Sequence, residues 1–233
     1  MLSNMLITTN FDSAALSGLA SITHPLREPG HWRLEAHGPR RVPIRTVDIV
    51  LRDGGQARVA VDLGHPTQDT DCCTAIEQLL TPGGMINLHD ASARGGGFAL
   101  LFRGSERDPF WDSRVLEPGD HFACMPLRPG RYLLTNLLSN ARSSLRVNYP
   151  DPRNTAQGLR LASGPLHAKV GRAIAPDELR IDPGQALVFA IEAECHLAAT
   201  LEEPDDGPPE LVEWRALRSR QALEAAFTRR HAS

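Results

Sequence analysis

The fold class is decided by one stretch of the chain, Leu116-Glu-Pro-Gly-Asp-His-Phe-Ala-Cys-Met-Pro-Leu-Arg-Pro-Gly-Arg-Tyr-Leu-Leu-Thr-Asn136, and by its continuation Ser144-Leu-Arg-Val147. Proline fixes φ near about −65° and glycine accepts positive φ, so Pro118-Gly119 and Pro129-Gly130 are typical of tight turns between extended segments. Apolar runs follow both turns. The pattern predicts a mainly β protein built as a β-sandwich.

Upstream of this stretch, the pattern predicts a hairpin and a short helix. Residues Thr46–Gly55 and Gln56–Leu63 are rich in β-branched and apolar residues, and Asp53-Gly54-Gly55 between them is typical of a hairpin turn. The segment Asp69–Leu80 carries apolar residues at helical spacing and is followed by a Thr-Pro-Gly stop signal. We therefore expect an internal helix there.

Downstream, residues 179–193 repeat the order strand, Pro-Gly turn, strand. The short match between residues 115–120 and 180–185 indicates either an internal repeat or a turn used twice by convergence. Apolar residues that follow or close these turns are expected in the core: Leu133, Val147, Leu187 and Phe189.

The C-terminal part of the chain predicts a linker and a helix. Residues 202–209 are acidic and rich in proline and glycine, whereas residues 210–230 have an apolar stripe at helical spacing. We expect three units: a sandwich over 1–150, a second β segment or partial repeat over 151–203, and a linker with the helix over 204–233. The stripe either packs on its own domain or binds a partner through Leu211, Trp214, Leu217, Leu223 and Phe227.

Composition narrows the function classes. The 233 residues carry a net charge of −3, and aromatic residues make up 5% of the chain, which argues against nucleic-acid binding through a basic, base-stacking surface. No apolar run approaches the ~20 residues of a membrane-spanning helix. The N-terminus lacks the basic region of a signal peptide, so a cytoplasmic protein is expected.

Three segments together resemble the core of a cupredoxin: Thr81-Pro-Gly-Gly-Met-Ile-Asn-Leu, Leu116-Glu-Pro-Gly-Asp-His-Phe, and Leu127-Arg-Pro-Gly-Arg-Tyr-Leu-Leu-Thr-Asn with its continuation to Val147. The resemblance covers about residues 81–148 and rests on turns and strand spacing. It implies a Greek-key β-sandwich whose last hairpin follows the Pro-Gly-x-Tyr turn.

The copper ligands that the resemblance implies are missing. The family's cysteine, four residues beyond the tyrosine, falls on Asn136, and residues 137–144 contain no His, Cys or Met. A blue-copper centre needs a thiolate, two imidazoles and a weak axial ligand. No cofactor is therefore expected, with copper at a non-standard site as the alternative.

Such a non-standard metal site would draw on four residues: His89, His121, Cys124 and Met125. On a strand, His121 and Cys124 lie three positions apart and so face opposite sides of the sheet. His89 and Asp90, beside the glycine-rich residues 95–97, are the best candidates for an enzyme's acid–base pair. Vicinal Cys72 and Cys73 are expected to be helix residues of ordinary reactivity.

Because no complete catalytic or metal-binding constellation is present, the preferred interpretation is a non-catalytic binding or assembly module. Such a module would be an accessory or structural subunit of a larger complex, with a protein partner or another copy of the chain as its ligand. The alternatives are a metal-handling or redox protein with the non-standard site, and an enzyme that uses His89 and Asp90.

Overall fold

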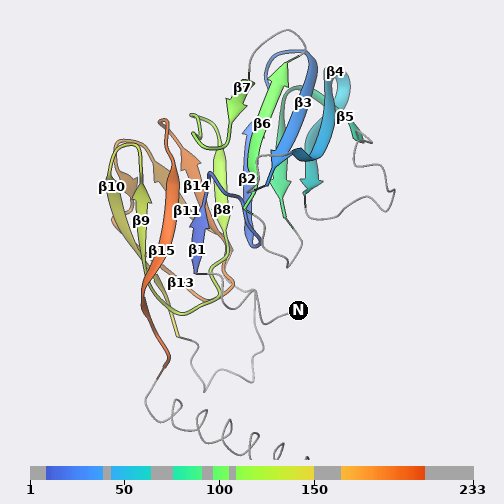
Figure 1. The fold of residues 1–233 in the computed structure, drawn as a ribbon. Coiled ribbons are helices and arrows are strands. Elements are labelled where there is room, and N and C mark those ends of the chain that lie inside the picture. The colour runs from blue at the N-terminus through green and yellow to red at the C-terminus, as the bar shows by residue number, and fades with distance from the viewer. Residues whose placement is uncertain are drawn as a thin grey trace, which may run out of the picture.

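The computed structural model describes residues 9–38, 43–63, 76–90, 97–104, 109–149 and 164–207. These residues form strands joined by turns and bends, with no helix among them. The strands make two mixed sheets, one of five strands and one of ten (Figure 1). The prediction of a mainly β protein is confirmed.

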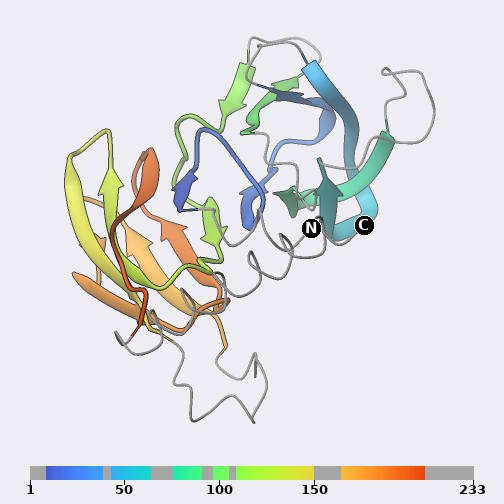
Figure 2. The same ribbon diagram turned by 60° about the horizontal axis from the view of Figure 1, so that its bottom comes forward.

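The strand bounds are as follows: β1 (Asn10–Asp12), β2 (Ala20–Pro25), β3 (Gly30–His37), β4 (Pro43–Asp62), β5 (Ile76–His89), β6 (Ala99–Gly104), β7 (Pro109–Asp112), β8 (His121–Cys124), β9 (Gly130–Asn136), β10 (Ala141–Val147), β11 (Leu166–Val170), β12 (Ile174–Ala175), β13 (Glu178–Ile181), β14 (Leu187–Ile191) and β15 (Leu197–Pro204). The five-stranded sheet has the order β1-β15-β9-β10-β13. The ten-stranded sheet has the order β12-β11-β14-β8-β2-β5-β4-β3-β6-β7 and curls strongly (Figure 2).

The chain contains an internal structural repeat with an offset of 100 residues. Phe11-Asp-Ser and Trp111-Asp-Ser open the two copies, and the spacing continues through Leu16 and Leu116 to the turns Pro29-Gly30 and Pro129-Gly130. Both glycines have positive φ, 139° and 147°. We refer to residues 10–104 as the first repeat and to residues 109–204 as the second repeat.

Strand pairing shows the same correspondence. β1, β2, β3 and β6 correspond to β7, β8, β9 and β15. The long strand β4 corresponds to β10 and β11, and β5 corresponds to β13 and β14, because β4–β5, β10–β13 and β11–β14 are all parallel pairs. The first strands are exchanged: β1 pairs with β15 of the second repeat, and β7 pairs with β6 of the first. The outer neighbour of β6 and the outer neighbour of β15 therefore each come from the other repeat.

An approximate two-fold axis runs between β2 and β8, the antiparallel pair that joins the repeats in the ten-stranded sheet. Ile22 lies opposite Phe122, and these two residues also occupy the same position in the two repeats. Both side chains are buried. The figures place β2 and β8 side by side between the strands of the two repeats (Figures 1 and 2). The β2–β8 pair is thus the structural centre of the molecule.

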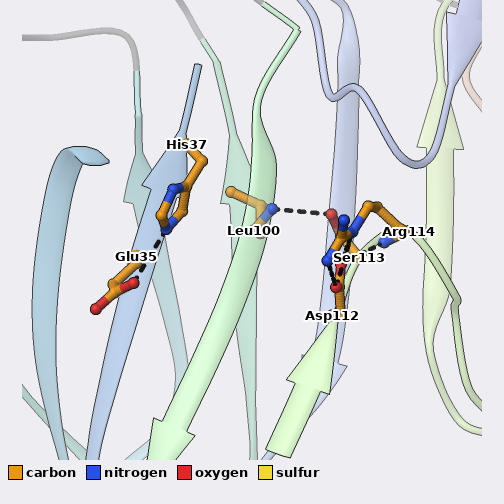
Figure 3. A network of polar contacts seen from close by, with 6 residues as sticks. All are labelled: Glu35, His37, Leu100, Asp112, Ser113 and Arg114. Carbon is orange, nitrogen blue, oxygen red and sulfur yellow. Dashed lines mark hydrogen bonds and ion pairs between the residues drawn. The ribbon is translucent and has the colours of Figure 1, made fainter. Parts of the chain in front are cut away.

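Hydrogen bonds repeat with the strands. The Ser13 amide donates to the Leu197 carbonyl, and the Leu197 amide donates to Ser13 Oγ. Ser113 and Leu100 make the same two bonds (Figure 3). Asp12 and Asp112 each accept the amide two residues ahead, which closes the turn after the exchanged strand.

Two secondary-structure predictions are wrong. Residues 46–63 do not form a hairpin: residues 46–62 lie in the single strand β4, whose two parts both run parallel to β5, with a register shift near Gly54 and Gly55. Residues 76–80, assigned to a helix, begin β5, because pairing with β4 overrides local helix propensity. Residues 69–75, with Cys72 and Cys73, lie outside the described residues.

Most of the predicted core residues are confirmed. Val147, Leu187 and Phe189 are fully buried, and Phe189 stacks on Phe122. Leu133 is only half-buried, so its assignment to the core is wrong: alternation along β9 places its neighbours Tyr132 and Leu134 inside. The match between residues 115–120 and 180–185 is not the repeat that the strand pairing shows. The predicted unit boundary at residue 150 and the C-terminal helix lie outside the described residues. The linker predicted over residues 202–209 is wrong at its start, because residues 202–204 end β15, which pairs with β9.

Candidate functional site

The residues predicted as metal ligands lie on two faces of the ten-stranded sheet. His121 is half-buried on the outer face of β8, whereas Cys124 is in the core, as the alternation along the strand requires. Met125 is half-buried just after β8. His89 lies on β5, and β2 separates that strand from β8. The predicted opposition of His121 and Cys124 is confirmed, and the four side chains do not share one face.

The two described cysteines are protonated thiols at neutral pH. Burial raises the pKa of Cys124 to about 12. Burial, followed by the negative charge of Asp120, raises the pKa of Cys195 to about 12. Metals and electrophiles react with the thiolate, not the thiol. In the described ranges, no group of three or more His, Cys, Asp or Glu side chains is placed to hold a metal ion.

The predicted acid–base pair occupies neighbouring positions with different environments. His89 is half-buried at the end of β5, and the next residue, Asp90, is 5% exposed. On the outer face beside His89, Asn87 donates a hydrogen bond of 2.8 Å to Thr23 Oγ1 across β5 and β2. Alternation along the chain sends His89 and Asp90 to opposite sides, so the two side chains do not face each other.

Asn136, at the position where the resemblance implies a cysteine, is a buried hydrogen-bonding residue. Its Oδ1 accepts the amide of Leu138 at 3.0 Å and that of His196 at 3.3 Å. His196 Nε2 in turn lies 2.7 Å from Asp12 Oδ1 on the exchanged strand β1. Asn136 therefore ties the β9–β10 hairpin to the segment before β15.

The tip of the β9–β10 hairpin presents two apolar side chains to solvent. Leu137 and Leu138 are 49% and 51% exposed and are the only large hydrophobic side chains classed as exposed in the described part of the chain. Their backbone is fixed, because the Leu137 amide donates to the His196 carbonyl and the Leu138 amide to Asn136. Asn140 closes the turn with a φ of 58°. The tip is a rigid apolar projection.

A buried polar cluster joins the two repeats beside the β2–β8 pair. His24 Nδ1 lies 2.6 Å from Asp120 Oδ1, and both side chains are at most 4% exposed. The other carboxylate oxygen of Asp120 accepts the Trp111 indole N–H at 2.9 Å and the Glu117 amide at 2.8 Å. The His24 ring stacks on Phe102 and lies at a tilt against Trp111, with centroids 5.5 and 4.6 Å away. We call these residues the His24–Asp120 cluster.

The cluster has the geometry of a structural pair. Three groups surround one carboxyl group: the His24 ring, the Trp111 indole and the Glu117 amide. Burial, then the charge of Asp120, raises the pKa of neighbouring Glu117. A histidine that activates a nucleophile needs that group at its free nitrogen. No described residue hydrogen-bonds His24 Nε2, which is buried.

The sequence prediction missed the His24–Asp120 cluster. His24 and Asp120 are 96 positions apart, and neither belongs to a catalytic motif. The 100-residue offset is the available signal: it identifies β2 and β8 as equivalent strands, whereas their pairing about Ile22 and Phe122 is visible only in the structure. The contact of His37 with Glu35 at 3.0 Å (Figure 3) is local to the first repeat.

The predicted partner-binding stripe, Leu211, Trp214, Leu217, Leu223 and Phe227, lies outside the described residues. Within those residues there is no helix with the length and apolar character needed to cross a membrane.

Comparison with known proteins gives no match. No family model fits the chain, and neither the curated proteins nor the solved structures contain a significant relative.

Proposed function

We propose that the chain is a non-catalytic binding or assembly module, an accessory or structural subunit of a larger complex. We also propose that its repeats are cupredoxin-like Greek-key sandwiches without the copper centre. The rigid apolar hairpin tip carries the functional proposal. The buried thiols and the sealed His24–Asp120 cluster are consistent with it, because neither offers a reactive group to solvent.

The tip suits protein recognition for an energetic reason. Burying apolar surface contributes about 25 cal/mol per Å², and binding costs less when the contacting segment is already ordered. Hydrogen bonds hold the Leu137 and Leu138 backbones in place before any contact. The chemistry of the two side chains fits a partner with an aliphatic pocket, surrounded by polar groups that complement Ser139 and Asn140.

The test replaces both leucines with serine and measures partner retention. Three forms of the chain are immobilised: the wild type, L137S/L138S and L137M/L138M. Each form is used to recover a cross-linked assembly from native cells. Methionine keeps the apolar area, so only the serine variant is expected to lose the same partner, by about tenfold or more. Equal retention by all three chains, at unchanged melting temperatures, would rule out the tip as the binding element.

A copper titration separates this proposal from electron transfer. Asn136 lacks the sulfur that a blue-copper centre requires, and it already accepts two backbone hydrogen bonds. Purified protein mixed with Cu(II) is expected to show no intense thiolate-to-copper absorption in the visible range. A stoichiometric blue species would contradict the assignment.

A further inference from the structure

The two ends of the β2–β8 pair are related by the approximate two-fold axis but differ in chemistry. At one end Ala20 lies opposite Cys124, and both are buried and apolar. One residue beyond the other end, the same register places His24 opposite Asp120, where they form the buried hydrogen-bonded pair. His24 and Cys124 are equivalent positions, as are Ala20 and Asp120. The two repeats therefore differ in chemistry at this pair of positions.

This asymmetry bears on which strands pair. Because β2 and β8 are structural equivalents, a second copy of the chain offers each of them a competing partner. β2 of one copy with β2 of another would keep the two-fold geometry, and so would β8 with β8. The exchanged strands β1 and β7 would find equivalent docking positions in such assemblies as well.

Side-chain chemistry penalises these competing pairings. In a β2–β2 pair, His24 would lie opposite Ala20 at both ends. In a β8–β8 pair, Asp120 would lie opposite Cys124 at both ends, which would bury two Asp120 side chains without the imidazole that each contacts in the β2–β8 pair. Burying an unpaired charge is strongly unfavourable. Only β2 with β8 places His24 on Asp120.

We propose that the His24–Asp120 pair specifies the pairing of the first repeat with the second and prevents strand-exchanged association between copies of the chain. The pair acts at the central β2–β8 pairing surface. The partner that it excludes from this surface is a second copy of this chain. A polar pair used for partner choice at the cost of stability is a known physical strategy.

The test gives both ends of the β2–β8 pair the same residues. In the variant W111F/H24C/D120A, each substitution introduces the residue found at the equivalent position of the other repeat, which is Phe11, Cys124 and Ala20 respectively. The chains are unfolded and refolded at about 1 mM, because tethered segments compete at effective concentrations in the millimolar range. Light scattering after size exclusion then measures the dimer. We expect at least about fivefold more dimer than for wild type or W111F, which keeps the ion pair.

A second variant protects the test against a folding failure. A20D/C124H builds a second His–Asp pair at the opposite end, so that like strands also satisfy each other, and it too is expected to raise the dimer fraction. The swap H24D/D120H preserves selective pairing and is expected to stay monomeric. The proposal is overturned if both folded symmetric variants match W111F, if the swap dimerises equally, or if neither symmetric variant refolds.

Discussion

The two ends of the β2–β8 pair occupy equivalent places in the two repeats, yet one is apolar and the other is a buried ion pair. Ala20 and Cys124 fill their end by packing alone. His24 and Asp120 fill theirs with three polar contacts to the Asp120 carboxyl group, from the His24 ring, the Trp111 indole and the Glu117 amide. The comparison shows that the same strand geometry accommodates an apolar pair or a polar pair. The strand geometry alone therefore does not explain why one end is polar.

Features that constrain the backbone are, by contrast, retained in both repeats. Glycine stands at positions 30 and 130, and Ser13 and Ser113 bond the same partner strand in the same way. The residue type is not retained at position 19: Leu19 adopts a φ of 67° where the second repeat has Gly119 at 102°. A non-glycine residue in that region costs about 1–3 kcal/mol, so the first repeat holds some strain there.

Breaking the ion pair is expected to have the largest effect. Asp120→Ala leaves His24 and the Trp111 indole without their carboxylate in the core, and loss of one partner from a buried pair costs about 3–5 kcal/mol. The measurement is urea unfolding. Cys124→Ala at the apolar end is the control, and we expect a loss of about 1–2 kcal/mol for it. Equal losses at both ends would mean that the cluster carries no special stability.

Substituting the turn glycines is expected to have the second-largest effect on stability, and the effect should differ between the two repeats. A Cβ at Gly130 would lie 2.4 Å from the Glu203 carbonyl oxygen, whereas a Cβ at Gly30 would meet nothing within 4 Å. Both positions have positive φ, so Gly30→Ala should cost about 1–2 kcal/mol and Gly130→Ala about 3 kcal/mol or more. Thermal unfolding of the two variants compares them, and a larger loss at Gly30 would contradict the close approach of β9 and β15.

Removing the repeated serine hydroxyls should instead affect the two repeats alike. Ser113→Ala and Ser13→Ala each leave a buried strand amide without its acceptor, for about 1–2 kcal/mol. Matching losses in denaturant unfolding would support the equivalence of β6 and β15. A loss confined to one serine would show that the repeats differ at the exchanged strand.

The smallest expected effect concerns pH on the outer face of the first repeat. Partial burial acts to raise the pKa of Glu35, but hydrogen bonds from His37 and Arg103 and their charge outweigh it, so the pKa lies below its ordinary value. The stabilisation is therefore present above the unfolded pKa of about 4.3 and is lost as pH falls through the lower folded pKa. Glu35→Gln should cost about 0.5 kcal/mol at pH 7, and unfolding curves of the two chains should converge near pH 3. A gap that persists at low pH would rule out the ion pair as its cause.

The fold class could be predicted from the Pro-Gly turns and the apolar runs that follow them, because such turns are local. The pairing of β4 with β5 could not, since Asp53-Gly54-Gly55 is also a good hairpin turn and only the parallel partner decides. The helix assigned to residues 69–80 failed at its end for the same reason: Leu79 and Leu80 fit a helical stripe or the start of β5 equally well.

The candidate sites were harder to predict from the sequence than the strand pairing. Alternation along β8 correctly separated His121 from Cys124, because that inference needs only one strand. The His24–Asp120 pair depends on residues 96 positions apart and on an exchange of strands between repeats, and no single segment encodes either. Exposure of Leu137 and Leu138 likewise depends on how far the β9–β10 hairpin projects, so an apolar pair in the sequence is not by itself a surface feature.

The most direct test of the paired-repeat architecture is a disulfide across the central strands. Ser21 lies opposite Ala123 on β2 and β8, and directly opposed residues fall within the Cα separation that a disulfide tolerates. Oxidised S21C/A123C is expected to remain a monomer with a 21–123 cross-link in its peptide map, whereas the diagonal pair T23C/A123C should link poorly. A chain that forms no 21–123 bond, or forms it only between molecules, would contradict the pairing of the two repeats about β2 and β8.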